Sequence, residues 1–329
     1  MGALAQTDAN IPGTDLTPSL ICLGTAQLGT GIPETDSFRL LDAFLDLGGS
    51  FVDTAHIYAD WQSTERAVSE KTIGRWLRRE KKRTSIVLAT KGGHHEPGTT
   101  RARLRPAEIL HDLQQSLSFL QSECIDLYWM HRDDRSRPVG ELLDFLEEQV
   151  RTGRIRYYGC SNWSIDRIEE ARKYADRRGI RGFVANQPMW SLARPNPDGI
   201  GDETMLAMGE TEVTFHRQNQ LTAVPYSSQP KGFFTKMHES RLPGSEAALM
   251  KMYANDENRL RSERAITVAR DRSRTVNEVV LAYLLSQPFP VFPIVGCRTV
   301  SHLENSMKAA SLRLDQTDLD YLERGGQPP

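Results

Sequence analysis

The sequence predicts an α/β fold, a (β/α)8 TIM barrel with extended βα loops at the C-terminal face. Strand-like and helix-like patterns alternate along the whole chain in about eight units, which implies a parallel sheet with right-handed crossovers. The length of 329 residues is typical of a barrel that forms one domain, which we place at 1–329. The glycine fingerprint G-x-G-x-x-G is absent, which disfavours an open-sheet dinucleotide-binding domain.

In the first half of the chain, the hydrophobic spacing indicates the order of the elements. Apolar residues recur at helical spacing over 36–48, and this helix stops at Gly48 and Gly49. Pro106 and Pro138 each stand at the first turn of a predicted helix, where a missing N–H costs nothing. The predicted strands are 20–29, 51–53, 85–91, 125–131 and 155–161, and the predicted helices are 36–48, 63–79, 106–120, 138–150 and 165–179.

The second half of the chain has shorter strand signals and longer loops. Two long loops are expected, one over 189–201 and one over 228–260, where Gly232, Pro243 and Gly244 interrupt any pattern. Long loops on a barrel commonly carry substrate contacts. The predicted strands are 182–187, 221–227 and 289–296, and the predicted helices lie near 202–218, 261–273, 275–286 and 299–310.

Ionisable side chains stand where three successive strands end. Asp53 and Tyr58 lie in FVDTAHIY, Lys91 closes SIVLATK, and His131 closes IDLYWMH. Because the C-terminal ends of parallel strands meet at one mouth of a barrel, we expect these side chains to converge there. A lysine ammonium beside a phenol lowers the pKa of the phenol, and a carboxylate keeps the lysine charged and oriented. We therefore predict that Tyr58 donates a proton to a carbonyl and that Lys91 lowers the pKa of Tyr58. Asp53 pairs with Lys91, and His131 orients the carbonyl.

Seven segments, in order along nearly the whole chain, resemble the aldo-keto reductase superfamily. They are DTAHIY, ATKGG, IDLYWMHRDD, YYGCSNW, ANQPMW, VPYSSQPKGFFT and PIVGCRTVSHLENS. The resemblance is to a long-loop member of bacterial type. It implies an NADP-dependent oxidoreductase that transfers hydride between nicotinamide and a carbonyl or alcohol, with the four residues above as its catalytic set.

The resemblance also implies which residues hold the cofactor. A guanidinium at the start of the last predicted helix suits a 2′-phosphate, so Arg298 favours NADP(H) over NAD(H). Ser306 takes the place of the family's usual Asn, and Asn305 that of an acidic neighbour. The predicted contacts are Ser161, Asn162 and Gln187 for the carboxamide, Tyr226 for ring stacking, Ser227, Lys231 and Gly232 for the pyrophosphate, and Gly296, Arg298, Thr299, His302, Asn305 and Ser306 for the adenosine phosphate end.

The substrate prediction comes from charged and aromatic residues near the mouth. Arg132, Asp133 and Asp134 directly follow the catalytic histidine, so at least one aspartate should face the mouth. Together with Trp61 and Trp129, Arg132 and Asp133 suit a polar carbonyl or alcohol that is sugar-like, a polyol or a cyclitol. Surface solvation is the alternative for the aspartates, and core packing is the alternative for Trp129.

The composition excludes several classes of partner. Lys and Arg number 41 against 43 Asp and Glu, a net charge of −2, so nothing favours nucleic acid. No apolar run is long enough to span a membrane, and the N-terminus lacks the pattern of a secretory signal. The four cysteines are far apart and are expected to be reduced thiols in a cytoplasmic protein. No feature of the sequence indicates an oligomeric state.

Two alternatives to a reductase stay open. One is a non-catalytic barrel that binds the cofactor and serves as a regulatory subunit. The other is a metal-dependent barrel hydrolase built on His94, His95, Glu96 or Asp133. Adjacent histidines on a loop seldom both bind one ion, and no spaced ligand completes the set, so we expect no metal.

Overall fold

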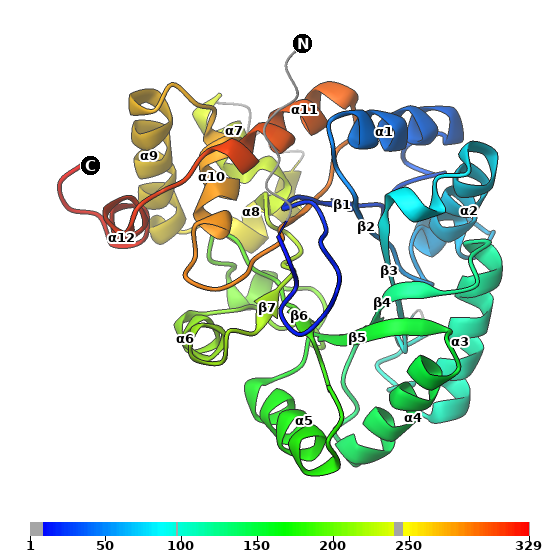
Figure 1. The fold of residues 1–329 in the computed structure, drawn as a ribbon. Helices are drawn as coiled ribbons and strands as arrows, with labels where there is room; N and C mark the ends of the chain where they lie inside the picture. The colour runs from blue at the N-terminus through cyan, green and yellow to red at the C-terminus, as the bar shows by residue number, and fades with distance from the viewer. Residues whose placement is uncertain (1–8, 97, 240–245, 329) are drawn as a thin grey trace.

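A computed structural model of the chain describes residues 9–96, 98–239 and 246–328. Within these ranges, strands and helices alternate, and all pairings between the strands of one eight-stranded sheet are parallel (Figure 1). The strands are β1 (Cys22–Gly24), β2 (Phe51–Asp53), β3 (Val87–Gly92), β4 (Ile125–Met130), β5 (Ile155–Ser161), β6 (Ala185–Gln187), β7 (Thr222–Ala223) and β8 (Ile294–Val295).

The sheet closes on itself through backbone hydrogen bonds between the segments around β7 and β8. The strand order is β7-β6-β5-β4-β3-β2-β1-β8. Ala223 N donates to Pro290 O at 2.9 Å, and Phe292 N donates to Ala223 O at 2.9 Å. Ile294 N donates to Pro225 O, also at 2.9 Å. Since these bonds join the two outer strands, the predicted (β/α)8 barrel is confirmed.

Side chains from alternate strand positions fill the barrel interior. Phe51, Ala89, Leu127 and Trp129 belong to one buried cluster, although they come from three different strands. Successive residues of a strand point to opposite faces, so Lys91 shares the inward direction of Ala89. The inward phase predicted for the end of β3 is therefore confirmed, and it delivers an ionisable group above the apolar interior.

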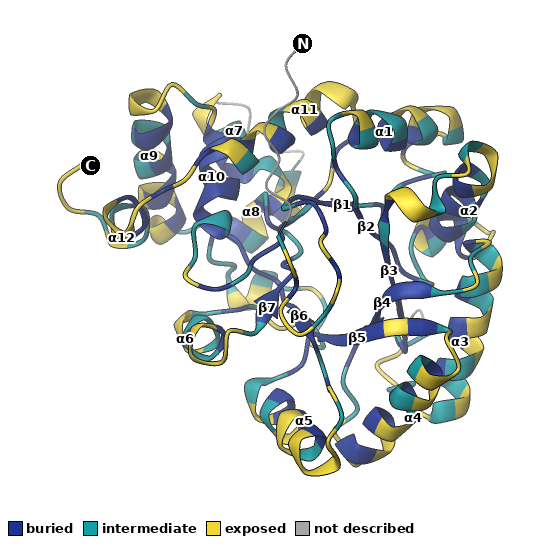
Figure 2. Cartoon of the chain, viewed as in Figure 1, coloured by how far each residue is buried: buried dark blue, intermediate teal, exposed yellow. Residues whose placement is uncertain are grey.

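The helices surround the barrel, with buried inner faces and exposed outer faces (Figure 2). Among the described residues, no helix combines the length and the apolar character needed to cross a bilayer. The α-helices are α1 (Glu34–Asp46), α2 (Val68–Glu80), α3 (Pro106–Phe119), α4 (Val139–Arg151), α5 (Ile165–Arg178), α6 (Glu210–Asn219), α7 (Phe233–His238), α8 (Ala247–Tyr253), α9 (Asp256–Asp271), α10 (Val276–Leu285), α11 (Val300–Lys308) and α12 (Gln316–Arg324). The short 3₁₀ helices are η1 (Asp60–Gln62), η2 (Arg83–Ser85), η3 (Pro197–Gly199), η4 (Pro230–Gly232) and η6 (Ala309–Ser311).

One helix begins later than the sequence predicted. The helix expected near 202–218 begins only at Glu210, because Gly209 N donates to Glu212 Oε2 at 2.7 Å and fixes the helix start there. Residues 202–209 consequently form a loop. This difference matters for the site, since it places Asp202 in that loop.

Two further segments contain helices that the sequence did not predict. The loop expected over 228–260 contains α7, α8 and the start of α9, and residues 240–245 within it lie outside the described residues. Phe233, Phe234 and Tyr253 pack together there, so tertiary contacts stabilise helices too short to show a period. Helix α12 was also not predicted, although Asp315 accepts from Asp318 N at 2.9 Å in a capping box that the sequence carries.

Candidate active site

The four predicted catalytic residues converge at the C-terminal ends of β2, β3 and β4. We call Asp53, Tyr58, Lys91 and His131 the tetrad. Lys91 Nζ donates to Asp53 Oδ2 at 2.5 Å and to Tyr58 OH at 3.0 Å. A third bond from Lys91 Nζ reaches Thr54 O at 2.7 Å. Asp53 and Lys91 are both about 1% exposed, whereas Tyr58 is partly exposed at the mouth. The lysine is thus fixed between a carboxylate below and a phenol above.

Asp53 is held by side chains that the sequence had assigned elsewhere. Trp129 Nε1 donates to Asp53 Oδ1 at 3.1 Å, and Gln187 Nε2 donates to the same oxygen at 3.0 Å. Trp129 is fully buried. The predicted contact of Trp129 with substrate is therefore wrong, because its indole N–H points to Asp53 inside the barrel. The side-chain amide of Gln187 likewise positions Asp53.

The surroundings of Tyr58 keep its hydroxyl protonated. Burial raises the pKa of Tyr58, and the Lys91 ammonium opposes this rise without reversing it. The predicted lowering by Lys91 is thus the smaller of two effects. Burial lowers the pKa of Lys91, but Asp53 and Tyr58 more than offset this, so the pKa of Lys91 lies above its ordinary value. At neutral pH the pair is a cation beside a neutral phenol, which is the arrangement a proton donor needs.

His131 lies beside this pair as a neutral imidazole. Burial, with the nearby His94 and Arg132, holds the pKa of His131 well below its ordinary value. Its ring centroid is 6.1 Å from that of Tyr58. Nδ1 of His131 is buried and has no hydrogen-bond partner among the described residues. A neutral imidazole can donate one hydrogen bond to a carbonyl oxygen but is a poor acid, so Tyr58 is the better proton donor.

Two loops bring three further ionisable side chains to the mouth. The His94 ring lies 4.6 Å from the His131 ring and 4.1 Å from the His95 ring. Asp202 Oδ2 lies 3.5 Å from His95 Nε2 and accepts from Arg132 Nη2 at 2.9 Å. Burial, assisted by Arg132, lowers the pKa of His94 to about 4. Sequence reasoning missed Asp202, because no local pattern connects it with residues that are 70 or more positions away.

The two aspartates after His131 are both held by other side chains. Asp133 Oδ2 accepts from Arg167 Nε of α5 at 3.0 Å, and Asp134 Oδ1 accepts from Ser136 Oγ at 2.6 Å. The chain turns outward after β4 and directs Asp133 toward the helical layer. The predicted placement of Asp133 at the mouth is therefore wrong, and Asp202 supplies a carboxylate there.

Two of the predicted substrate contacts do lie near the tetrad. Trp61 is 58% exposed, and its ring centroid lies 6.1 Å from that of Tyr58. Arg132 is buried, and its Nε donates to Thr204 Oγ1 at 2.7 Å. Trp61 thus presents an aromatic face to any ligand at the mouth, while Arg132 is held by loop residues.

The residues predicted to hold nicotinamide form one connected group beside the tetrad. Asn162 has a left-handed backbone, with φ of 60°. Its Nδ2 donates to Ser161 Oγ at 3.1 Å, and its Oδ1 accepts from Tyr226 OH at 2.7 Å. Ser161 Oγ donates to Gln187 O at 2.8 Å. The structure therefore brings together the four residues that were predicted to surround one ring, and their contact with the cofactor stays a prediction.

The predicted pyrophosphate segment has an unusual backbone. Ser227, Lys231 and Gly232 have φ values of 56°, 53° and 75°. Backbone N–H groups in turns of this kind can form concave anion sites. Lys231 is exposed and has no ion-pair partner among the described residues.

The predicted phosphate end lies at the start of α11. Arg298 is exposed and also lacks an ion-pair partner among the residues that the structure describes. Thr299 is the N-cap of this helix, because its Oγ1 accepts from His302 N at 3.2 Å. A helix N-terminus with a free guanidinium beside it attracts an anion.

The residues predicted to contact adenosine divide into exposed and buried members. Ser306 is fully buried, and Gln229 Nε2 donates to its Oγ at 3.0 Å. Gln229 Oε1 accepts from Gly296 N at 3.1 Å, and Asn305 Oδ1 accepts from Asn277 Nδ2 at 2.8 Å. Ser306 therefore positions Gln229, and a direct adenine contact through its side chain is not supported.

These features fit a nicotinamide dinucleotide. Two exposed cations, Arg298 and Lys231, lie in the segments predicted to bind the phosphates of the cofactor. Neither has an ion-pair partner among the described residues. A Cβ added at Gly296 would meet nothing within 4 Å, so the backbone there borders open space. At the other end, Nδ1 of His131 is buried without a hydrogen-bond partner among the described residues. The donor set thus provides cations where phosphates would lie and a proton donor at the mouth.

Comparisons with known proteins agree with this geometry. The model of the Aldo/keto reductase family matches residues 20–325. An uncharacterized oxidoreductase of Bacillus subtilis is 31% identical, with 96% of each chain covered. An aryl-alcohol dehydrogenase [NADP(+)] of Phanerodontia chrysosporium is 28% identical over 94% of this chain and 83% of that protein. The solved structure of a thermostable aldo-keto reductase in complex with epalrestat has the same fold, with a TM-score of 0.71, 21% identity, and coverage of 98% and 100%. The protein belongs to the aldo/keto reductase family, whose members are oxidoreductases acting on carbonyl or alcohol groups.

Proposed function

We propose that this protein is a catalytically active, NADP(H)-dependent aldo-keto reductase. The observation that carries the proposal is the buried contact chain Asp53–Lys91–Tyr58, with distances of 2.5 and 3.0 Å. A cation held between a carboxylate and a phenol has one evident use at a barrel mouth, which is proton transfer to and from a substrate oxygen.

The residues of the chain supply positioning and proton transfer. The cofactor supplies the hydride when it is bound. Tyr58 OH then donates its proton to the oxygen on which negative charge develops. Lys91 stabilises the resulting phenolate and is itself held by Asp53. His131, neutral and buried, hydrogen-bonds the same oxygen and limits its orientation.

The preference for NADP(H) over NAD(H) rests on Arg298. Its guanidinium is exposed next to the N-cap of α11 and has no ion-pair partner among the described residues. Such a group can bind a phosphate with two hydrogen bonds. One relative carries NADP(+) in its name, which supports the same choice.

The substrate class that we propose is polar: a sugar-like carbonyl, or the matching polyol or cyclitol. Asp202, His94 and His95 offer hydroxyl-binding atoms at the mouth, and they replace Asp133 in this role. Trp61 supplies a flat face beside them.

A second candidate class is an aromatic aldehyde or alcohol. Trp61 and Leu206 are large apolar side chains that are 58% and 38% exposed, and Leu206 N donates to Asn162 Oδ1 at 3.1 Å. Both side chains can contact an aromatic ring. Two relatives are named aryl-alcohol dehydrogenases, which supports this class.

The test is a cofactor-coupled absorbance screen of the purified protein. Sugar aldehydes, keto-sugars and substituted benzaldehydes are offered with NADPH and NADH, and polyols, cyclitols and benzyl alcohols with NADP⁺ and NAD⁺. Highest kcat/KM on polyhydroxylated compounds with NADPH supports the proposal, and highest values on benzaldehydes select the aromatic class. Tight NADPH binding without turnover of any compound would favour the regulatory-subunit alternative. Loss of activity on treatment with a chelator would favour metal-dependent chemistry. A cytoplasmic location, and one domain over 1–329, stay predictions of the sequence.

A further inference from the structure

Three side chains at the mouth have the composition and spacing of a metal site. His94 and His95 come from the loop between β3 and α3, and Asp202 comes from the loop before α6. One ligand atom from each residue lies within 4.8 Å of the other two. The sequence had suggested no metal because no spaced ligand accompanied the two histidines, and the tertiary structure supplies that ligand.

The hydrogen bonds of the two histidines leave the same nitrogen available on each. His94 Nδ1 lies 2.8 Å from His95 O, and His95 Nδ1 lies 3.3 Å from Glu96 O. A carbonyl oxygen can only accept, so each Nδ1 carries a proton, and in the neutral ring Nε2 is the nitrogen with the free lone pair. This is the pattern in metal-binding histidines, whose other ring nitrogen usually donates to a backbone carbonyl or a carboxylate.

His95 Nε2 faces the Asp202 carboxylate. It is buried, makes no hydrogen bond within the described part of the chain, and lies 3.5 Å from Asp202 Oδ2. Two acceptor atoms that face each other need a positive charge between them, which is either a proton on His95 Nε2, giving an ion pair with Asp202, or a bound cation. We propose that His94, His95 and Asp202 form a binding site for a divalent transition-metal ion of the Zn²⁺ class, with a fourth position open to water or ligand. Two imidazoles and one carboxylate are a common ligand set for such ions.

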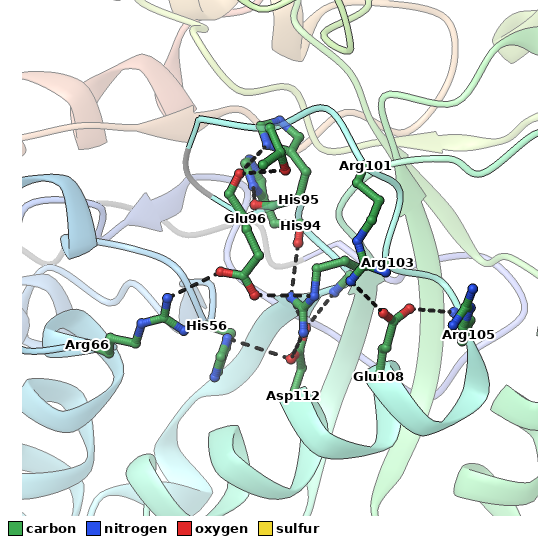
Figure 3. Close-up of polar contacts among 12 residues, drawn as sticks. His56, Arg66, His94, His95, Glu96, Arg101, Arg103, Arg105, Glu108 and Asp112 are labelled. Carbon is green, nitrogen blue, oxygen red and sulfur yellow. Dashed lines mark hydrogen bonds and ion pairs between the residues drawn. The ribbon is translucent and has the colours of Figure 1, made fainter.

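The site is held in place before any ion binds. Asp112, buried in α3, accepts from Gly93 N at 2.9 Å and from Arg103 Nη2 at 2.9 Å. Arg103 Nη1 in turn donates to His94 O at 3.0 Å, and its Nε lies 3.5 Å from Glu96 Oε1. Figure 3 shows Arg103 and Asp112 below the two histidines. The loop geometry is therefore set by a buried ion pair, so little ordering is needed on binding.

The third ligand is equally constrained. Asp202 Oδ1 accepts from Thr204 N at 2.8 Å and from Thr204 Oγ1 at 2.5 Å, while Oδ2 faces His95 and Arg132. A carboxylate oxygen has two lone pairs, so Oδ2 can bind an ion and still accept from Arg132. The guanidinium charge weakens the site, because it repels a second cation nearby. We therefore expect reversible binding of added metal, and not a permanently held ion.

An ion at this position would lie beside the catalytic centre. The His94 ring is 4.6 Å from the His131 ring. The bound ion would occupy the space through which a carbonyl substrate approaches, whereas the predicted cofactor residues lie on β5, β6 and the later loops. We infer that Zn²⁺ inhibits competitively against substrate and leaves cofactor affinity unchanged. This inhibition rests on the proposed function, whereas metal binding itself does not.

The binding test uses full-length protein freed of metal with a chelator. Calorimetric titration with Zn²⁺ should give one site per chain, and Co²⁺ should develop the intense visible absorption of a low-coordinate complex. His95→Gln should weaken Zn²⁺ binding by roughly 10–100-fold or more, since loss of a group that supports a metal site costs about that much. Asp202→Asn should have a similar effect, and thermal unfolding checks that both variants remain folded.

A matched control is His111→Gln, which removes an exposed histidine from α3. It should bind Zn²⁺ like the wild type. Absence of a Zn²⁺ site in the wild type, or equal binding by folded His95→Gln, would overturn the proposal. Loss of binding in His111→Gln would do the same, because it would move the site to the protein surface.

The inhibition test measures initial rates with increasing Zn²⁺ at several substrate concentrations. A rise in apparent KM with constant kcat, abolished in His95→Gln, supports a site at the mouth. Zn²⁺ that binds the wild type through His95 without changing the kinetics would contradict the inferred inhibition but not the binding site. If no substrate is found, the calorimetric and spectroscopic results still decide the binding proposal.

Discussion

The two halves of the barrel wall carry different kinds of functional residue. In the first half, β1 and β2 have 3 residues each, β3 and β4 have 6 each and β5 has 7. Asp53, Lys91 and His131 lie on or directly after the ends of β2, β3 and β4, and Tyr58 lies in the loop after β2. In the second half, β6 has 3 residues and β7 and β8 have 2 each. Most predicted cofactor residues there lie in loops or at the start of α11.

Burial follows the same division. Lys91 is 1% exposed and has three hydrogen-bond partners, whereas Arg298 and Lys231 are exposed and lack ion-pair partners among the described residues. A proton donor must be held to a fraction of an ångström, and Tyr58, in the loop after β2, is held by Lys91 of the buried strand β3. A cofactor must enter and leave, which exposed loop groups permit. The comparison predicts that changes in the first half affect the chemical step and that changes in the second half affect binding.

The two largest effects are expected for Tyr58→Phe and Lys91→Met. Removal of the proton donor should lower kcat by roughly 10²–10⁴-fold, the range typical of general acid catalysis. Affinity for NADPH, measured by fluorescence titration, should be nearly unchanged, because Tyr58 belongs to the catalytic half. Unchanged kcat would show that another group donates the proton.

Lys91→Met tests whether the pair acts as one unit. Its loss in kcat should equal or exceed that of Tyr58→Phe, since Lys91 Nζ contacts both Tyr58 OH and Asp53. The double variant should be barely worse than either single variant. Multiplicative losses in rate would instead mean that the two residues work independently.

Arg298→Ala examines the second half of the wall. Loss of a charge-assisted contact to phosphate costs about 1.5–3 kcal/mol, or roughly 10–150-fold in Kd for NADPH. NADH lacks the 2′-phosphate and serves as the internal control, and kcat at saturating NADPH should be preserved. Equal weakening of both cofactors would place the phosphate near other residues, with Lys231 and His302 next to be tested.

Trp61→Ala tests a proposed substrate contact at the mouth, in the loop after β2. Its exposed ring beside Tyr58 can contact substrate without touching the reacting atoms. We expect kcat/KM to fall by about 0.5–1.5 kcal/mol, or roughly 2–12-fold, mainly through KM. A fall in kcat alone would indicate that Trp61 positions Tyr58 and does not bind substrate.

The smallest catalytic effect is expected for Asp133→Asn. Asp133 pairs with Arg167 in the helical layer, so kcat/KM should stay within about twofold of the wild type while stability falls by about 1–3 kcal/mol through the weakened buried bond. Chemical unfolding and the substrate screen measure the two effects. A large loss of activity against polyhydroxylated substrates alone would restore Asp133 to the substrate site.

The sequence alone determined the barrel and the location of the tetrad. Both depend on local signals: the alternation of strand and helix periods, and the parity that directs Lys91 to the same face as Ala89. Because all strands of a parallel barrel end at one face, a residue at a strand end can be assigned to the mouth without knowledge of the packing.

Only the tertiary structure decided what surrounds the tetrad. Asp202 lies beside His95, although the two residues are more than a hundred positions apart in the sequence. Asp133 turns outward because its carboxylate accepts a hydrogen bond from Arg167 of α5. Trp129 and Gln187 bind Asp53 from below, which depends on how deeply each strand is set in the barrel. These contacts join residues that are distant in sequence, so no local period encodes them. They arise only when packing of the barrel and its helices fixes where each loop lies.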